Sequence, residues 1–193
     1  MIIDNKKRCG WVNHKNQLYI DYHDIEWGVP LHNDQQLFEL ICLEGAQAGI
    51  SWEMILNKRE EYRKCFWGFD VEVLISKTDN ELLSRIQDFG VVKNKLKTVG
   101  IKKNAFAFKN IVLEHGSFDH FLWSYVNCKP VVNKWNNFHD APTSNDVSKK
   151  LSTDLKKYGF TFIGPVICYA FMQSCGMVSD HELDCWRSHN NAT

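Results

Sequence analysis

The amino-acid sequence predicts an all-α fold. Apolar residues recur mainly at helical spacing, whereas the alternating β-branched runs that are typical of strands are scarce. Only four prolines interrupt the 193 residues, so long helices are possible. A hydrophobic content of 44% with 24% charged residues is typical of a globular protein. We expect residues 1–193 to form a single unit, and two helical lobes without a marked boundary are the alternative.

The first two long helices are indicated by their capping residues. Asn33 or Asp34 can cap a helix that runs to about Ala48, because both side chains accept hydrogen bonds from free backbone N–H groups. Gly49 then interrupts the pattern. Ser51 can cap the next helix, which begins directly afterwards.

The middle of the chain has the pattern of further helices ended by glycines. Residues 79–89 form one such segment, and residues 93–115 form a longer one that we expect to be broken near Gly100. Residues 118–126 predict a short aromatic helix. Residues 127–140 are rich in asparagine and contain a proline, so they predict an irregular loop.

The last part of the chain predicts two helices joined by a tight turn, over about residues 148–176. Thr143 or Ser144 can cap the first of these helices. Gly164 and Pro165 can open the second, because proline is well tolerated at the first helical position. The free N–H groups at that helix start can hold a DNA phosphate, but an ordinary αα-hairpin has the same pattern.

Composition limits the possible compartments and partners. No apolar run approaches the ~20 residues that cross a bilayer, and residues 1–8 are too charged for a secretory signal. Seven cysteines without framework spacing indicate a reducing compartment. We therefore expect a cytoplasmic monomer with no membrane partner.

The net charge of zero argues against binding nucleic acid by bulk electrostatics. The positive charges are nevertheless clustered. Residues 89–113 contain six lysines, including Lys93 and Lys97, and no acid. Such a strip can face a phosphate backbone, although a solvated lysine-rich helix surface is the commoner explanation.

Glu44 is the most informative single residue. Read as a helix, the positions three and four residues away hold Leu40, Ile41, Gln47 and Ala48, so the carboxyl lies among apolar or small neighbours. Burying an ionised carboxylate there is costly unless a partner or ligand meets it.

Several aromatic residues occur around Glu44 in the sequence. A carboxylate flanked by indole and phenol rings suits a pocket for a flat heteroaromatic ring, because the rings stack on its faces while the acid accepts from its N–H edge. Ordinary core packing is the alternative, since aromatics in small domains are usually buried. The candidates are Trp11, Tyr19, Tyr22, Trp27 and Trp52.

Two cysteines and two histidines have the composition of a structural zinc site. Cys9 and His23 lie near the start of the chain, and His181 and Cys185 are four residues apart near its end. That second spacing would let one helical turn direct both side chains to one point. Four protein ligands form the closed tetrahedral set of structural zinc. The alternative is two buried thiols and two histidines that are unrelated to one another.

These features together resemble the bacterial DNA-3-methyladenine glycosylase I family, over about Lys7 to Cys185. The matching strings are Arg8-Cys9-Gly10-Trp11-Val12, Tyr22-His23-Asp24 with Glu26-Trp27-Gly28-Val29-Pro30, Ile41-Cys42-Leu43-Glu44-Gly45 with Gln47-Ala48-Gly49 and Ser51-Trp52, Trp123-Ser124-Tyr125-Val126-Asn127, Gly159-Phe160 through Gly176, and Asp180-His181. The resemblance implies a helix-hairpin-helix glycosylase fold whose N- and C-terminal segments are tied by one structural zinc ion.

The resemblance also implies a reaction. The protein would flip 3-methyladenine out of double-stranded alkylated DNA and hydrolyse the N-glycosidic bond, leaving an abasic site without cutting the strand. Glu44 would be the catalytic-centre residue that reads the base, with Tyr22 assisting and Trp52 stacking. The remaining implied residues are Trp11, Trp27 and Tyr19 for the pocket, and Cys9, His23, His181 and Cys185 for zinc. From the hairpin and the lysine strip themselves, we expect Gly164, Lys93 and Lys97 to contact the DNA backbone.

Three other functions stay open at this point: a zinc hydrolase with another substrate, a protein that binds damaged DNA without releasing a base, and a structural helical module. Four protein ligands argue against the first, because a catalytic zinc keeps an open position. Asp180 is a second acid of interest, either as a water activator or, more simply, as a helix cap or a partner of His181.

Overall fold

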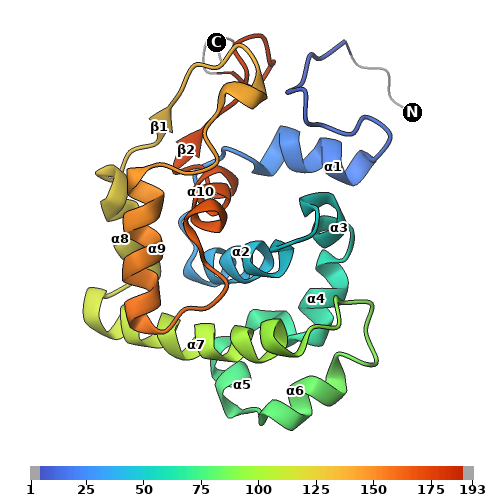
Figure 1. Ribbon diagram of the computed structural model, residues 1–193, viewed down its shortest axis with the longest axis vertical. Coiled ribbons are helices and arrows are strands. Elements are labelled where there is room, and N and C mark those ends of the chain that lie inside the picture. The colour runs from blue at the N-terminus through green and yellow to red at the C-terminus, as the bar shows by residue number, and fades with distance from the viewer. Residues whose placement is uncertain (1–4, 189–193) are drawn as a thin grey trace.

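The computed structural model describes residues 5–188, which are built almost entirely from helices, as the sequence predicts (Figure 1). The helices are α1 (Gln17–Asp21), α2 (Asp34–Gln47), α3 (Trp52–Asn57), α4 (Arg59–Cys65), α5 (Val71–Ser76), α6 (Asp79–Arg85), α7 (Lys95–His115), α8 (Phe118–Trp123), α9 (Asp146–Tyr158) and α10 (Pro165–Ser174). A π-helical turn spans Tyr22–Glu26, and 3-10 turns span Trp67–Phe69, Ser124–Val126 and Phe138–Asp140. The strands β1 (Val131–Val132) and β2 (Val178–Ser179) pair in parallel.

The capping residues of α2 and α3 are those that the sequence predicts. The Asn33 side chain accepts from the Gln36 amide at 3.0 Å, and Ser51 Oγ accepts from the Met54 amide at 3.3 Å. Gly49 between the two helices has φ +82°, a conformation that glycine adopts at little cost. The chain therefore turns sharply directly after the helix that carries Glu44.

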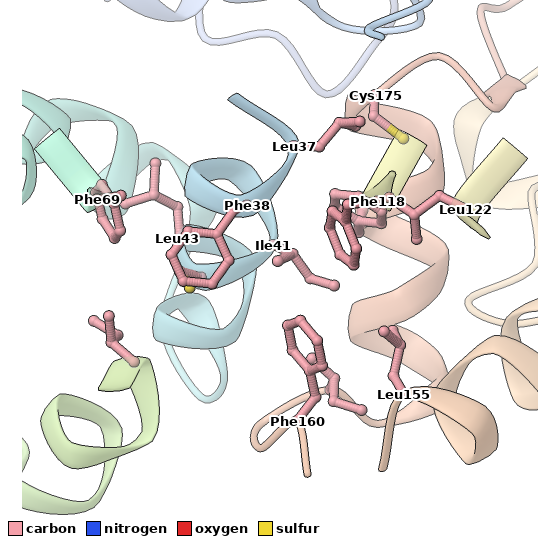
Figure 2. Packing of buried hydrophobic residues seen from close by; sticks show 14 of the residues in the cluster. Leu37, Phe38, Ile41, Leu43, Phe69, Phe118, Leu122, Leu155, Phe160 and Cys175 are labelled. Carbon is pink, nitrogen blue, oxygen red and sulfur yellow. The ribbon is translucent and has the colours of Figure 1, made fainter. Parts of the chain in front are cut away.

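The hydrophobic core surrounds α2, which runs through the middle of the molecule (Figure 1). Leu37, Phe38 and Ile41 of α2 are fully buried, and the same core contains Phe118 of α8 and Phe160 from the turn after α9 (Figure 2). Each such side chain contributes roughly 1.5–3 kcal/mol when it leaves water. Packing on several sides therefore fixes α2, and with it the position of Glu44.

The helix α7 differs from its prediction because Gly100 does not break it. α7 is continuous over 21 residues and ends at Gly116. Gly100 is instead a point of close approach, since a Cβ there would lie 2.8 Å from Thr161 Oγ1 and 3.1 Å from the Phe162 ring. The turn between α9 and α10 rests on this glycine.

Two helix ends also differ from the sequence prediction. α9 is capped by Asn145 rather than Thr143 or Ser144, and the Asn145 side chain accepts from the Ser148 amide at 2.8 Å. α6 ends at Arg85 and is followed by turns, so it is shorter than the predicted segment 79–89. Neighbouring capping residues are chemically equivalent in sequence, and only the path of the backbone distinguishes them.

Several elements have no sequence prediction. α1, α4 and α5 are too short to show a helical period. The predicted loop 127–140 contains β1, which joins β2 near the C-terminal end with Val131 opposite Val178. In residues 5–188 no helix has the length and apolar character of a bilayer span.

The helix–turn–helix formed by α9 and α10 agrees with the predicted hairpin. Gly159 ends α9 with φ +103°, and Pro165 is the first residue of α10. Ser152 Oγ in α9 donates to the Ile163 carbonyl at 2.6 Å and so ties the turn to its first helix. The two helices pack against each other (Figure 1), and Val166 near the start of α10 is exposed.

Candidate functional site

Four buried side chains from the two ends of the chain converge on one point. Single ligand atoms of Cys9, His23, His181 and Cys185 all lie within 4.8 Å of one another. Cys185 Sγ is 3.4 Å from His23 Nε2 and 3.6 Å from His181 Nδ1, and Cys9 Sγ is 3.5 Å from His181 Nδ1. Tetrahedral zinc bound by cysteine and histidine places its ligand atoms roughly 3.3–3.8 Å apart. The donor set and these distances fit a closed structural metal site.

A second layer of contacts orients the histidines. His23 Nδ1 lies 2.7 Å from Asp24 Oδ1, and His181 Nε2 lies 3.2 Å from the Trp27 carbonyl. Arg8 binds Asp24 through Nε and Nη2. Burial opposes ionisation of Asp24, but the hydrogen bonds from Arg8, His23 and Trp186 lower its pKa to about 2. Such outer partners fix the ring orientation of metal-binding histidines.

The pair at the C-terminal end does not lie on a helix, so the prediction that one helical turn directs both residues is wrong. His181 lies two residues after the end of β2, and Cys185 lies in the turns after it. The Cys185 amide donates to the Glu182 carbonyl at 2.9 Å, which folds the chain back by the four residues that separate the ligands. The pairing of β1 with β2, and not a helix, therefore positions the turn that carries the two ligands.

Glu44 lies on the buried face of α2 and is 1% exposed. Ser174 Oγ donates to Glu44 Oε1 at 2.5 Å, whereas Oε2 has no hydrogen-bond partner among the described residues. Burial raises the pKa of Glu44 to about 8, and the hydrogen bond from Ser174 opposes this shift. The carboxyl is therefore half satisfied, which is the state expected of a group that waits for a ligand.

A cavity of about 220 Å³ opens onto Glu44. Two further buried side-chain atoms without a hydrogen-bond partner belong to residues that line it, namely the acceptor Gln47 Oε1 and the donor Trp52 Nε1. Most polar atoms inside proteins are satisfied, so a concentration of unpaired ones in one cavity indicates a binding site for a polar molecule.

Aromatic rings form the walls of this cavity. The ring centroids of Trp11 and Trp27 are 5.0 Å apart, those of Trp11 and Tyr19 are 5.2 Å apart, and those of Tyr22 and Trp52 are 5.4 Å apart. All five residues line the cavity together with Glu44. The structure thus brings together every pocket residue that the sequence singles out.

The cluster of Cys9, His23, His181 and Cys185 shares a wall with the cavity. The Trp11 ring centroid lies 5.3 Å from that of His23, and the Trp27 ring centroid lies 4.6 Å from that of His181. The N-terminal segment that supplies these tryptophans is held by Cys9 and His23. Fixing that segment therefore also fixes one side of the aromatic pocket.

Known proteins share this arrangement and sequence. The sequence pattern of the family described as methyladenine glycosylase matches residues 11–188. A DNA-3-methyladenine glycosylase of Haemophilus influenzae is 47% identical, over 92% of this chain and 96% of its own. The chain belongs to the methyladenine glycosylase family.

Solved structures of this glycosylase family superpose closely on the chain. The crystal structure of a 3-methyladenine DNA glycosylase I has a TM-score of 0.91 at 42% identity, covering 94% of this chain and 100% of its own. A variant of 3-methyladenine DNA glycosylase I in complex with 3-methyladenine has a TM-score of 0.88 at 37% identity, covering 92% and 95%. The helical architecture therefore agrees with that of a family member seen with a base bound.

Asp180 also lines the cavity, but its carboxylate is fully engaged. Oδ1 accepts from Asn133 and Trp135 at 2.7 and 2.8 Å, and Oδ2 accepts from Tyr169 and Gln173 at 2.8 and 2.7 Å. These donors come from the segment around β1 and from α10. Asp180 joins these segments at the edge of the cavity, and its four hydrogen bonds are not made to His181, which is one of its expected partners.

The three residues predicted to contact the DNA backbone have different surroundings. Gly164 precedes α10 at the surface, with open space around it. Lys93 is exposed, and its Nζ donates to the Gln87 carbonyl at 3.3 Å. Lys97 Nζ instead donates to the carbonyls of Ala46 and Ala48, at the C-terminal end of α2.

Sequence reasoning missed three polar residues of the cavity: Gln47, Gln173 and Ser174. Gln47 lies one helical turn after Glu44, so its place on the same face was available as a signal. Gln173 and Ser174 lie at the end of α10, far from Glu44 in sequence. Nothing in a single sequence indicates that this helix end meets α2.

Proposed function

We propose that this chain excises 3-methyladenine from alkylated DNA by hydrolysing the N-glycosidic bond and leaves an abasic site without cutting the strand. The observation that carries the proposal is the half-satisfied Glu44 carboxyl in an aromatic cavity. The family relatives include a DNA-3-methyladenine glycosylase and a variant in complex with 3-methyladenine. A base must leave the DNA stack to reach a cavity of this kind.

The aromatic walls favour a positively charged base. Methylation at N3 makes adenine cationic and a better leaving group, so the bond needs little general-acid help. A cation over an aromatic face is stabilised by about 0.5–2 kcal/mol. Neutral adenine gains less from the same face. Trp52, Tyr22 and the two tryptophans of the N-terminal segment supply these faces, with Tyr19 at their edge.

Glu44 supplies the polar recognition. Its free Oε2 is the acceptor that we assign to the N6 amino edge of the base, which guanine-like edges lack. Ionising Glu44 at pH 7 costs about 1.4 kcal/mol, because its pKa is about 8. A cationic base offsets this cost by attraction to the carboxylate, whereas neutral adenine does not. Glu44 therefore selects a base both by its positive charge and by the amino group on its edge.

The cluster of Cys9, His23, His181 and Cys185 is proposed to hold one structural zinc ion. Two thiolates and two imidazoles are preferred zinc ligands, and the four protein ligands complete a tetrahedron. Zinc at this place contributes folding free energy and holds the tryptophan wall of the pocket. The closed ligand set also distinguishes the site from that of a hydrolytic zinc enzyme.

The start of α10 is the proposed contact for a DNA phosphate. Pro165 has no N–H, so the free donors at this helix start are the amides of Val166 and Ile167 beside Gly164. Val166 is exposed, which leaves this end of the hairpin accessible. Lys93, which is exposed just before α7 in the lysine strip, is a separate proposed contact to the DNA backbone. A helix start binds anions through its N–H groups and its dipole.

The test is incubation of the purified protein with methylated duplex DNA, followed by chromatography of the released bases. Recovery of free 3-methyladenine supports the proposal, and gel electrophoresis should show intact strands until the abasic sites are cleaved by alkali. Binding of methylated DNA without base release would instead show a damage-binding protein. Glu44→Gln is the matched variant, and it should release the base more slowly.

A further inference from the structure

Ser174, the last residue of α10, makes the only hydrogen bond that Glu44 receives from a side chain in the described part of the chain. The Ser174 hydroxyl is buried and has three polar neighbours. It lies 2.5 Å from Glu44 Oε1 and 2.9 Å from the Ala170 carbonyl, and it accepts from the Tyr22 hydroxyl at 2.9 Å. Two of these neighbours are acceptors, and one is a donor.

A serine hydroxyl has one hydrogen, so it can satisfy only one of the two acceptors at a time. When Glu44 is ionised, Ser174 donates to Oε1 and accepts from Tyr22. When Glu44 carries its proton on Oε1, that proton is donated to Ser174 Oγ, and the serine hydrogen turns to the Ala170 carbonyl. Each state keeps a hydrogen bond between Ser174 and Glu44.

The surroundings of Glu44 contain no competing cation. The titratable groups facing it are Tyr19 and Tyr22 from the N-terminal segment, Cys175 after α10 and Asp180 after β2. None of these becomes positively charged, and no lysine, arginine or histidine lines the cavity in residues 5–188. Ser174 is therefore the one neighbour that stabilises the Glu44 carboxylate before a base arrives.

We propose that Ser174 is a positioning residue that holds the Glu44 carboxyl in both of its protonation states, so that Oε2 always faces the base. This inference rests on the proposed role of Glu44 as the acceptor for the base. Glu44 releases its proton to water before the cationic base binds, and the serine hydrogen then turns from Ala170 to the carboxylate. The carboxyl needs no rotation to become ready.

The direct test is a carbon-13 NMR titration of the Glu44 side-chain carboxyl in the full-length, metal-bound protein. Ser174→Ala removes the donor, and we expect the titration midpoint to rise by about one pH unit. Ser152→Ala is the matched control, because Ser152 is an equally buried helix serine whose hydroxyl donates to the Ile163 carbonyl. That control should leave the Glu44 midpoint unchanged.

The second readout is the pH dependence of kcat/KM for excision, which reports groups of the free enzyme. Ser174→Ala should move its midpoint upward by the same amount and regain activity at high pH. A purely structural serine would instead lower the rate at every pH without moving the midpoint.

The two readouts distinguish two failures. An unchanged NMR midpoint in Ser174→Ala overturns the positioning role of Ser174, whatever the activity shows. A shifted NMR midpoint together with full excision by Glu44→Gln upholds the Ser174 contact but rejects Glu44 as the reader of the base.

Discussion

At the scale of single residues, Glu44 shows how far a local pattern leads. The apolar neighbours along the helix predict its burial, and burial of a carboxylate demands a partner. The partner is Ser174, 130 residues later in the chain, and it satisfies one oxygen only. A single sequence indicates that Glu44 needs a hydrogen-bond partner but does not identify it, because the contact with Ser174 depends on how α10 packs against α2.

Glu44→Gln should lower kcat/KM for 3-methyladenine excision by about 10- to 100-fold, because a hydrogen bond to a charged group contributes about 1.5–3 kcal/mol. In the wild-type protein, kcat/KM should rise with pH as Glu44 ionises, with a midpoint at about pH 8, and level off above it. The variant should lose this rise, as steady-state assays across pH will show.

The variant should still fold, since glutamine retains an acceptor for Ser174 and removes a buried acid. Glu39→Gln is the matched control on α2, because Glu39 binds Arg63 and does not line the base cavity. Unchanged excision by Glu44→Gln across this pH range would reject its role as reader.

The roles of the two lysines predicted to bind DNA can be distinguished by experiment. Lys97 binds two carbonyls at the end of α2, so Lys97→Met should lower the free energy of unfolding by about 1–2 kcal/mol in urea titrations. Lys93→Met should change stability by less than about 0.5 kcal/mol. It should instead reduce the salt dependence of DNA binding by about one counterion. A larger effect of Lys97 than of Lys93 on that salt slope would contradict this assignment.

At the scale of elements, the longer helices and the short helices α3, α6 and α8 follow from the sequence, whereas α1, α4 and α5 do not. Caps at Asn33 and Ser51 define the ends of α2 and α3, and Pro165 defines the start of α10. Gly100 misled the prediction, because glycine lowers helix propensity and also permits close approach of another backbone. Which of the two reasons applies depends on the hairpin that packs there.

Gly100→Ala tests this reading of α7. If glycine served only as a helix interruption, alanine would stabilise the helix by up to about 1 kcal/mol. The structure predicts the opposite sign, a loss of about 1–3 kcal/mol, because the new methyl group would meet Thr161 and Phe162. Chemical denaturation followed by circular dichroism measures the difference.

Gly90→Ala is the matched control, since its added Cβ would make ordinary contact with Glu61 at 3.4 Å. Stabilisation by Gly100→Ala would show that the hairpin does not press on α7. A destabilised variant should also bind undamaged duplex DNA more weakly, because the displaced turn carries the proposed phosphate contact.

At the scale of the whole molecule, the two ends of the described chain form one structure. The Cys2His2 cluster, the β1–β2 pair and the hydrogen bonds of Asp180 all join segments that are distant in sequence. Composition and spacing provide a plausible ligand set, and the family resemblance selects it. The structure adds a contact that residue spacing cannot predict. The histidines of the same cluster pack against Trp11 and Trp27 of the pocket.

This coupling would make the proposed zinc ion a determinant of folding rather than a reactant. Cys185→Ser should release the zinc and lower the melting temperature by several degrees, because metal binding at a site formed only on folding contributes to stability. Cys128→Ser is the control, since Cys128 is exposed and lies outside the cluster. Elemental analysis and thermal denaturation of the two variants should differ accordingly.

Chelation should follow the same logic in time. A closed site offers no open coordination position, so a chelator should not act as a fast reversible inhibitor. We expect base excision to decline only as slowly as the proposed zinc ion leaves, and the decline should coincide with loss of the folded protein. Inhibition that occurs within the mixing time and is reversed by dilution would mean that the metal takes part in the reaction. A native protein that contains no metal would reject the proposed zinc site.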